Sequence, residues 1–149
     1  MTLMSTLAKN KRAYFDYNIL EKYEAGIVLA GCEVKAIKLG HISLQGSYVI
    51  IKDNEAFLLN VHITPYQPAN IPKDYNPTRT RKLLLKRSEI KTLIGKSRVH
   101  GLTILPLLVY TKRERIKVQI GLARSKKKYE KRELIRKRDI EREIGTRLR

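Results

Sequence analysis

The sequence lacks most of the residues that build disulfides, metal centres and membrane spans. Cys32 is the single cysteine among 149 residues, which excludes an internal disulfide and any zinc site with several thiolate ligands. Tryptophan is absent, and no apolar run approaches the roughly 20 residues that cross a bilayer. The first residues also lack the basic leader and apolar stretch that secretion requires. We therefore expect a cytoplasmic protein with no membrane association.

Acidic residues are also scarce. The chain has 14 Asp+Glu against 32 Lys+Arg, a formal net charge of +18 at pH 7. Such a charge creates a surface field that attracts polyanions. A membrane surface is the weaker candidate, because the basic residues do not lie opposite a wide Trp/Phe/Leu face. Nucleic acid is therefore the expected partner, and binding should neutralise roughly 5 to 8 phosphates.

No constellation of catalytic residues is visible. The carboxylates are mostly single and interleaved with Lys and Arg, so the acidic cluster of a metal-dependent nuclease is missing. His41, His62 and His100 do not share a zinc-ligand spacing with Cys32, whose neighbours indicate a structural thiol. No glycine-rich phosphate loop occurs. We predict that the protein is not an enzyme and has no catalytic residue, metal or cofactor.

The β-forming residues fall into runs separated by turn signals. The pattern predicts a strand within residues 14–30, with Gly26 at a bend or close approach, and a hairpin of 47–52 and 55–63 around Asp53 and Asn54. A second antiparallel pair is predicted from 102–110 and 116–123. Short helices are predicted over 32–39, ended by Gly40, and from an N-cap at Ser88 to Gly95. Four prolines predict an exposed loop between residues 65 and 77.

This order of elements predicts a mainly β fold. The best match is a closed antiparallel barrel of the oligonucleotide-binding type, with two or three short helices at its ends. We expect an N-terminal arm over residues 1–12, an RNA-binding β-barrel domain over 13–124 and a basic C-terminal tail over 125–149.

The tail has a helix-forming composition but little apolar surface. Ile140, Ile144 and Leu148 recur every four residues as a narrow stripe, and Gly145 lowers helicity by about 1 kcal/mol. We therefore predict a flexible tail that is disordered in solution and becomes helical when a polyanion neutralises it.

Three basic segments are candidates for contact with nucleic acid. They are residues 10–12, 79–82 and 124–128, and Tyr129 beside the last one offers a ring for stacking on a base. Each segment taken alone could be ordinary solvated surface, and Tyr129 an ordinary aromatic of the tail. Their combination on a chain of this charge favours RNA binding.

Seven ordered motifs between Asn10 and Leu148 resemble the small protein B (SmpB) family of SsrA-binding proteins. The motifs are residues 10–13 (Asn-Lys-Arg-Ala), 23–26 (Tyr-Glu-Ala-Gly), 31–35 (Gly-Cys-Glu-Val-Lys), 63–66 (Ile-Thr-Pro-Tyr), 76–85 (Asn-Pro-Thr-Arg-Thr-Arg-Lys-Leu-Leu-Leu), 121–127 (Gly-Leu-Ala-Arg-Ser-Lys-Lys) and 129–132 (Tyr-Glu-Lys-Arg). The resemblance implies a protein that binds the tRNA-like domain of transfer-messenger RNA, or SsrA RNA. It would deliver this RNA to the A site of stalled bacterial ribosomes for trans-translation, ribosome rescue and tagging of incomplete proteins.

The resemblance also implies two sets of site residues. Residues expected at the transfer-messenger RNA surface are Asn10, Lys11, Arg12, Glu24, Leu84, Arg124, Lys126 and Lys127. Residues of the tail expected in the small-subunit decoding centre and the mRNA channel are Tyr129, Lys131, Arg132, Arg138, Ile144 and Gly145. The protein is expected to be a monomer in this complex.

Two positions depart from the family pattern. Tyr14 and Phe15 stand where Arg and His are usual, and Ser125 stands where Gly is usual. Two other function classes stay open on the residues alone. A structural ribosomal or other rRNA-binding protein would share the charge and the barrel, and an RNA-processing enzyme would require an acid-base or metal site.

Overall fold

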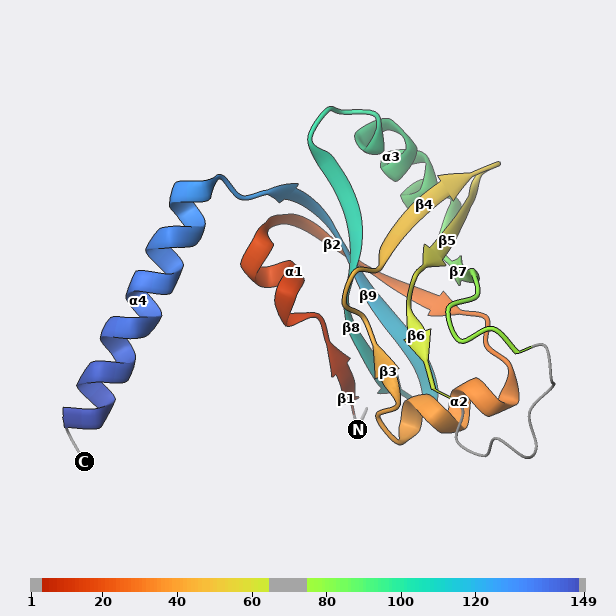
Figure 1. Cartoon of the computed structure of the whole chain (residues 1–149). Coiled ribbons are helices and arrows are strands. Elements are labelled where there is room, and N and C mark those ends of the chain that lie inside the picture. The colour runs from red at the N-terminus through yellow and green to blue at the C-terminus, as the bar shows by residue number, and fades with distance from the viewer. Residues whose placement is uncertain (1–3, 65–74, 148–149) are drawn as a thin grey trace.

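The computed structural model describes residues 4–64 and 75–147, which form a curled antiparallel sheet with helices around it (Figure 1). The main sheet has seven strands in the order β1-β8-β4-β5-β7-β2-β9, and β9 also pairs with β8, so that the sheet curls into a barrel. Its strands are β1 (Met4–Lys9), β2 (Tyr17–Ile27), β4 (Tyr48–Lys52), β5 (Glu55–Leu59), β7 (Arg81–Leu84), β8 (Leu102–Lys112) and β9 (Arg115–Ser125). A separate small sheet pairs β3 (Ile42–Ser43) with β6 (His62–Ile63).

Both predicted hairpins are confirmed. Asp53 and Asn54 connect β4 to β5 with φ angles of 52° and 60°, a turn geometry that matches the twist of paired strands. Arg113 and Glu114 connect β8 to β9 with φ angles of 52° and 65°, although neither residue type favours that conformation. The long β8–β9 pairing therefore stabilises a turn that local preference disfavours.

The oligonucleotide-binding type of barrel is confirmed, but the barrel is not strictly closed. Strands β4 and β8 share a single register pair, Val49 with Ile104, and β2 and β7 share two. Helix α3 (Arg87–Ser97) contacts both β4 and β8, and its Leu93 is fully buried in the core cluster that contains Val49 and Ile104. Hydrophobic packing by α3 thus covers the gap that the backbone ladder leaves.

Helices α2 (Gly31–Lys38) and α3 lie near opposite ends of the barrel (Figure 1). Gly40 follows α2 with φ = +80°, the left-handed conformation that ends a helix, as predicted. The predicted ends of the second helix were wrong. Helix α3 begins after Lys86, whose backbone N–H donates to the Glu89 carboxylate at 3.2 Å, and Gly95 lies inside it.

The N-terminal segment differs most from the sequence prediction. Residues 4–9, predicted to belong to an arm, form β1 and pair with β8. Helix α1 (Lys11–Asp16) takes in Tyr14 and Phe15, which were predicted to be strand residues. The buried Asn10 explains this helix. Its side chain accepts from the Ala13 N–H (3.1 Å) and donates to the Pro106 carbonyl (2.9 Å), where an irregularity in β8 leaves that carbonyl available.

The hydrophobic core lies between the inward faces of the strands. A smaller cluster beneath α1 contains Ala13, Leu105, Leu107 and Ala123. A Cβ atom at Gly121 would lie 2.7 Å from Leu107 Cδ1, so any other residue here would displace the buried Leu107 side chain. The proline-rich loop predicted between residues 65 and 77 falls largely on residues 65–74, outside the described part of the chain.

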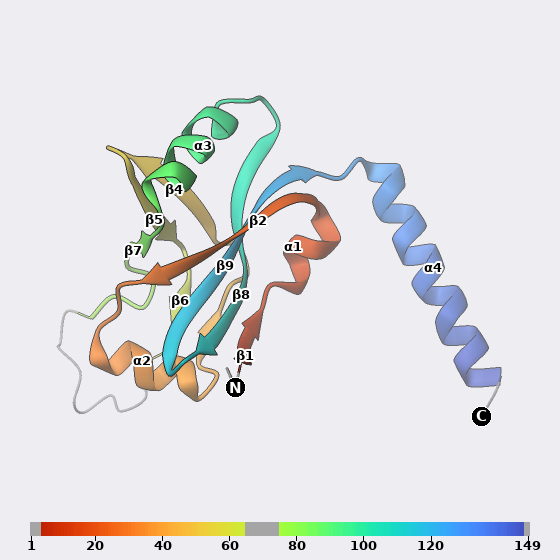
Figure 2. The ribbon, with the colours of Figure 1, turned by 180° about the vertical axis from the view of Figure 1, so that it is seen from behind.

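Helix α4 (Lys128–Arg147) follows β9 and extends away from the barrel in both views (Figures 1 and 2). The helix covers residues whose composition favours helix, and its dependence on a polyanion stays a prediction. Disorder of the free tail in solution stays a prediction, as does the division into arm, domain and tail.

Candidate nucleic-acid interface

Six of the eight predicted RNA-contacting residues gather around α1. We call them the junction cluster: Asn10, Lys11, Arg12, Arg124, Lys126 and Lys127. Arg124 pairs with Asn18 across the β2–β9 ladder, which brings the end of β9 beside α1. Lys126 is fixed to α1 twice, because its N–H donates to the Asp16 carbonyl (2.8 Å) and its Nζ to the Tyr14 carbonyl (3.0 Å). Cations more than 100 positions apart thus form one surface, whereas Asn10 is 6% exposed and supports α1 from beneath.

Asp16 is the acidic centre of this surface. Its Oδ2 accepts from Arg12 Nε at 2.9 Å, and its Oδ1 lies 3.4 Å from Lys131 Nζ on α4. One carboxylate therefore orients a cation of the barrel and a cation of the tail. The cluster keeps a large positive excess, because Lys11, Arg124 and Lys127 are exposed around it.

The other two predicted residues, Glu24 and Leu84, lie at the far end of β2. Leu84 pairs with Gly26 across the β2–β7 ladder, so Leu84 and Glu24 are diagonal neighbours on one sheet face. Gly26 permits this approach, because a Cβ atom there would lie 3.3 Å from that of Leu84. Leu84 is 53% exposed and is therefore accessible to a ligand.

Glu24 is held by hydrogen bonds. The Tyr110 hydroxyl donates to its Oε2 at 2.5 Å, and Lys112 Nζ lies 3.4 Å away. The bond from Tyr110, with a smaller contribution from Lys112, lowers the pKa of Glu24. Burial, followed by the Glu24 carboxylate, raises the pKa of Tyr110. Glu24 is thus an ionised, oriented acceptor suited to amino or hydroxyl groups of a nucleotide.

The structure does not bring all eight residues to one place. Glu24 lies seven positions along β2 from Tyr17, which is beside the junction cluster, and at strand spacing this is roughly 23 Å. The interface therefore has two parts, a strongly cationic one at the base of the tail and a mixed apolar and acidic one at Leu84 and Glu24.

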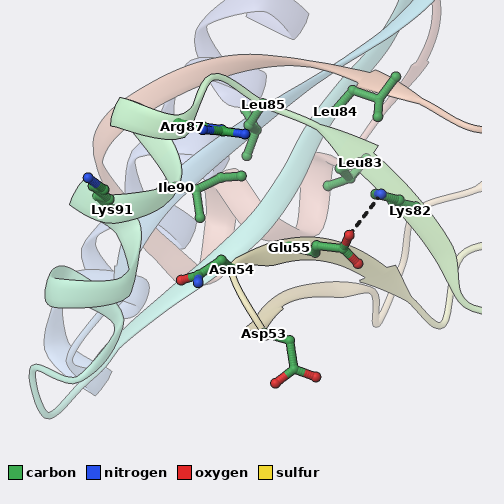
Figure 3. Close-up of a pocket in the computed structure, with 10 residues that line it drawn as sticks. All are labelled: Asp53, Asn54, Glu55, Lys82, Leu83, Leu84, Leu85, Arg87, Ile90 and Lys91. Carbon is green, nitrogen blue, oxygen red and sulfur yellow. Dashed lines mark hydrogen bonds and ion pairs between the residues drawn. The ribbon is translucent and has the colours of Figure 1, made fainter.

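A surface pocket of about 620 Å³ lies next to Leu84 (Figure 3). The turn between β4 and β5 forms one side and α3 forms another, and their basic lining residues are Lys82, Arg87 and Lys91. Lys82 is partly neutralised, because its Nζ is 3.0 Å from Glu55 Oε1. The pocket extends the predicted site at Leu84 with cations that the sequence analysis did not single out, apart from Lys82.

The basic segment 79–82 was predicted as RNA-contacting surface, and for Arg81 this was wrong. Arg81 is fully buried, and its Nη2 is 2.5 Å from Oε2 of the equally buried Glu33 on α2. Arg79 also pairs with Glu33, and Arg81 donates to the carbonyls of Val61 and Pro77 at 2.8 and 2.9 Å. These two arginines hold β7 and its preceding loop against α2 rather than meeting phosphate. Nothing in the sequence pattern distinguished them from their exposed neighbour Lys82.

Three of the predicted tail residues are described with their side chains. Lys131 lies against Asp16, Arg132 is exposed, and the Arg138 guanidinium lies 5.2 Å from the centre of the Phe15 ring. The backbones of Tyr129, Ile144 and Gly145 belong to α4, and the side chains of Tyr129 and Ile144 lie outside what the structure describes.

Phe15 is a contact residue that the sequence analysis marked only as a departure from a family pattern. It faces Arg138 of the tail, and the neighbouring Tyr14 ring lies 5.3 Å from Lys9 Nζ and 5.8 Å from Lys22 Nζ. Both aromatic residues therefore contact cations of the same chain. The unusual residue types at these positions were the signal that could have located the contact.

Within the described ranges, no helix is long and apolar enough to cross a membrane. The same residues contain no group of three His, Cys, Asp or Glu side chains placed to hold a metal ion.

Comparison with known proteins gives consistent relatives. The SmpB protein family model matches residues 7–149. An SsrA-binding protein from Sulfurihydrogenibium sp. is 54% identical over 138 residues, 93% of this chain and 90% of the relative. The one from Cupriavidus necator is 51% identical over 138 residues, 93% of this chain and 92% of the relative.

A solved structure described as "tmRNA-SmpB: a journey to the center of the bacterial ribosome" is also similar. It superimposes with a TM-score of 0.69 and 43% sequence identity, over 83% of this chain and 87% of the other. Family match, curated relatives and fold agree along nearly the whole sequence, and the chain belongs to the SmpB family.

Proposed function

We propose that the protein binds the tRNA-like domain of transfer-messenger RNA and delivers it to the vacant A site of stalled ribosomes. Trans-translation, rescue of the ribosome and tagging of the incomplete protein follow from that delivery. The relatives are named SsrA-binding proteins, and the similar solved structure couples SmpB with transfer-messenger RNA and the bacterial ribosome. The protein acts as a monomer in the complex and works in the cytoplasm.

The observation that carries this proposal is the junction cluster. Its cations project from α1 and from the end of β9. Hydrogen bonds join these two elements, so the spacing of the cations is set before RNA binds. A prearranged set of Lys and Arg side chains suits a folded RNA, which is recognised by shape and phosphate position. Glu24 and Leu84 would contact the same RNA at a second place.

The tail has a separate role in this scheme. Its cations, among them Lys131, Arg132 and Arg138, would enter the mRNA channel together with Tyr129, Ile144 and Gly145. A polycationic helix gains most binding free energy in a channel that has walls of RNA and holds no mRNA. A channel that still holds mRNA would exclude the tail, so the tail distinguishes stalled from translating ribosomes.

Sequencing the RNA that co-purifies with the protein from cells tests the first step. We expect transfer-messenger RNA to dominate. Recovery of ribosomal RNA alone would contradict the proposal and favour a structural ribosomal protein, which would also be equally abundant on translating and stalled ribosomes. Turnover of RNA by the purified protein would contradict the proposal that it is a binding protein and not an enzyme.

Truncation after Lys128 tests the separation of barrel and tail. We expect affinity for the tRNA-like domain to stay nearly intact, because the junction cluster and the Glu24 region remain. Tagging on stalled ribosomes should be abolished, because the channel-entering residues are gone. Equal loss of both activities would show that barrel and tail do not have separate roles.

A further inference from the structure

A hollow beside α1, separate from the pocket next to Leu84, is lined by residues of the kinds that bind a nucleotide. An open hollow of about 310 Å³ lies between α1, the start of β2, the turn before β4, and β8. Its lining residues include Arg12, Tyr17 and Tyr48, and Thr103 of β8. We propose that this tyrosine slot, defined by Arg12, Tyr17, Tyr48 and Thr103, binds one unpaired RNA base. The proposal rests on the proposed function only in taking RNA as the ligand.

The floor of the tyrosine slot is rigid. Asn10 is 6% exposed and its amide is bonded to Ala13 and Pro106, and the buried Ser47 hydroxyl donates to the Leu44 carbonyl. These polar groups are engaged within the protein and leave little freedom to the walls above them. A preformed cavity lowers the ordering cost of binding.

The walls offer what a nucleobase requires. Tyr48 is 38% exposed on the outer face of β4, Tyr17 is half-buried, and the Arg12 guanidinium is held by Asp16 at 2.9 Å. Aromatic rings and guanidinium planes are the groups on which unpaired bases stack. The hydroxyls of Tyr17, Tyr48 and Thr103 form no hydrogen bond with the described residues, so they are available to the edge of a base.

A cationic hollow adjoins the slot. Its volume is about 560 Å³, it shares Asn10 and Arg12 with the slot, and it is lined further by Lys9, Lys11 and Arg138. A nucleotide whose base occupies the slot would place its phosphate among these cations. Arg138 belongs to α4 and is positioned by the Phe15 ring, so the tail completes the phosphate side of a site whose base side belongs to the barrel.

The tyrosine slot requires an unpaired base, and this requirement distinguishes it from the surface that we propose to bind folded RNA. A paired base is stacked within its helix and cannot enter a cavity, whereas a base in a loop, bulge or single strand can. The tyrosine slot therefore gives the protein a contact for single-stranded RNA next to the base of the tail.

The test uses the full chain and a uridine hexamer that carries one central 2-aminopurine, whose fluorescence falls when it stacks. We expect quenching on binding to the wild-type protein, and about fivefold or more weaker binding with reduced quenching for Tyr48→Leu. Tyr48→Phe, which keeps the ring, should restore both. The matched control is Phe57→Leu on the neighbouring strand β5, outside the slot, which should behave as wild type.

A second pair of variants tests the phosphate side. Arg138→Gln should reduce the salt dependence of hexamer binding by about one phosphate contact. Arg136→Gln removes the same charge from the other side of α4, because two residues along a helix are about 200° apart, and should have a smaller effect. Equal effects of the two substitutions on the salt dependence would contradict a specific phosphate contact by Arg138.

Parallel titration with the tRNA-like domain separates this proposal from the proposed function. We expect Tyr48→Leu to bind the folded RNA as wild type does. Equal quenching by wild type and Tyr48→Leu, or equal weakening by Phe57→Leu, would overturn the slot. Equal loss of folded and single-stranded RNA binding by Tyr48→Leu would also overturn it. Failure of the wild-type protein to bind the tRNA-like domain would contradict the proposed function alone.

Discussion

Glu33, Arg79 and Arg81 form an ion-pair network with a structural role, although the two arginines belong to a basic segment. Glu33 and Arg81 are fully buried, and two arginines share the one carboxylate. Glu33 also accepts from the Ala30 N–H at 2.9 Å, which caps α2. Buried charges are tolerated only when they are paired and hydrogen-bonded, and this network meets both conditions. It fixes the position of β7, and therefore of Leu84.

We expect Glu33→Gln to destabilise the fold strongly. The change leaves the buried Arg81 without its counter-charge, and breaking one partner of a buried pair costs about 3 to 5 kcal/mol. Urea unfolding followed by circular dichroism measures the free energy of unfolding. Glu55→Gln is the control, because its pair with Lys82 is half exposed and should contribute less than about 1 kcal/mol. A loss as small as the control's would contradict the structural role of the network.

The same carboxylate predicts a loss of stability in acid. Burial alone would raise the pKa of Glu33, but the hydrogen bonds from Arg79, the Ala30 N–H and Arg81 outweigh it and lower the pKa below 4.5. A lowered folded-state pKa stabilises the protein above the unfolded value, and this contribution is lost as the pH falls through the folded-state pKa. Unfolding free energies measured from pH 6 downward should fall below about pH 4.5, and less steeply in Glu33→Gln. An unchanged slope in that variant would rule out Glu33 as the cause.

At the scale of elements, the contact between α1 and α4 is small and exposed. Among the described residues it includes the Asp16–Lys131 ion pair and the Phe15–Arg138 contact, and Lys126, in the link between β9 and α4, adds hydrogen bonds to α1. Ile135 and Ile140 of α4 are 48% and 50% exposed, so these two apolar side chains of the helix are not buried against the barrel. Exposed ion pairs and cation–π contacts contribute about 1 kcal/mol or less each. Such a contact favours one orientation of the tail but is too weak to hold the tail rigidly against the barrel.

A peptide of residues 125–149 should therefore be mostly unfolded alone. Its apolar stripe is narrow and a single helix without packing is marginal in water. We expect a low helical signal in circular dichroism at low salt and a clear increase when a polyanion such as heparin is added. Full helicity at low salt without a polyanion would contradict the prediction.

Elements with strong local signals could be predicted, and those made by distant contacts could not. The β4–β5 hairpin is encoded by Asp53 and Asn54, and the end of α2 by Gly40. Helix α1 has no apolar periodicity and depends on Asn10 reaching Pro106, which is 96 residues away. Strand β1 likewise forms only by pairing with β8. Helix α3 was displaced because the Glu89 carboxylate, not the Ser88 hydroxyl, caps its first turn.

The candidate site was predictable to a similar degree. The cations around α1 were identified from the family motifs, and the structure brings six of the eight residues together, although one of the six, Asn10, is buried. The split between this cluster and Glu24 could not be predicted, because it depends on the register of β2 against β7 and β9. The burial of Arg81 could not be predicted either, since a charge run gives no sign of which member faces the core.

Across the whole molecule, the net charge of +18 is divided between the barrel and the tail. If the tail contacts the channel and not the tRNA-like domain, both the full chain and a chain truncated after Lys128 should neutralise roughly 5 to 8 phosphates of that RNA. The measurement is the slope of log affinity against log salt concentration. A clearly smaller slope for the truncated chain would show that the tail also contacts the folded RNA.

Two neighbouring strand pairs of the barrel share very few residue pairs, and this predicts the order in which the chain folds. One register pair joins β4 to β8 and two join β2 to β7, so the ring consists of a three-stranded unit, β4-β5-β7, and a four-stranded unit, β1-β8-β9-β2. Each unit contains a hairpin with a two-residue turn, and such local contacts close quickly, whereas pairing between distant segments is slower. Docking of the two units, with Leu93 of α3 between them, should then be the late event in refolding. Truncating Leu93 would accelerate unfolding more than it slows folding.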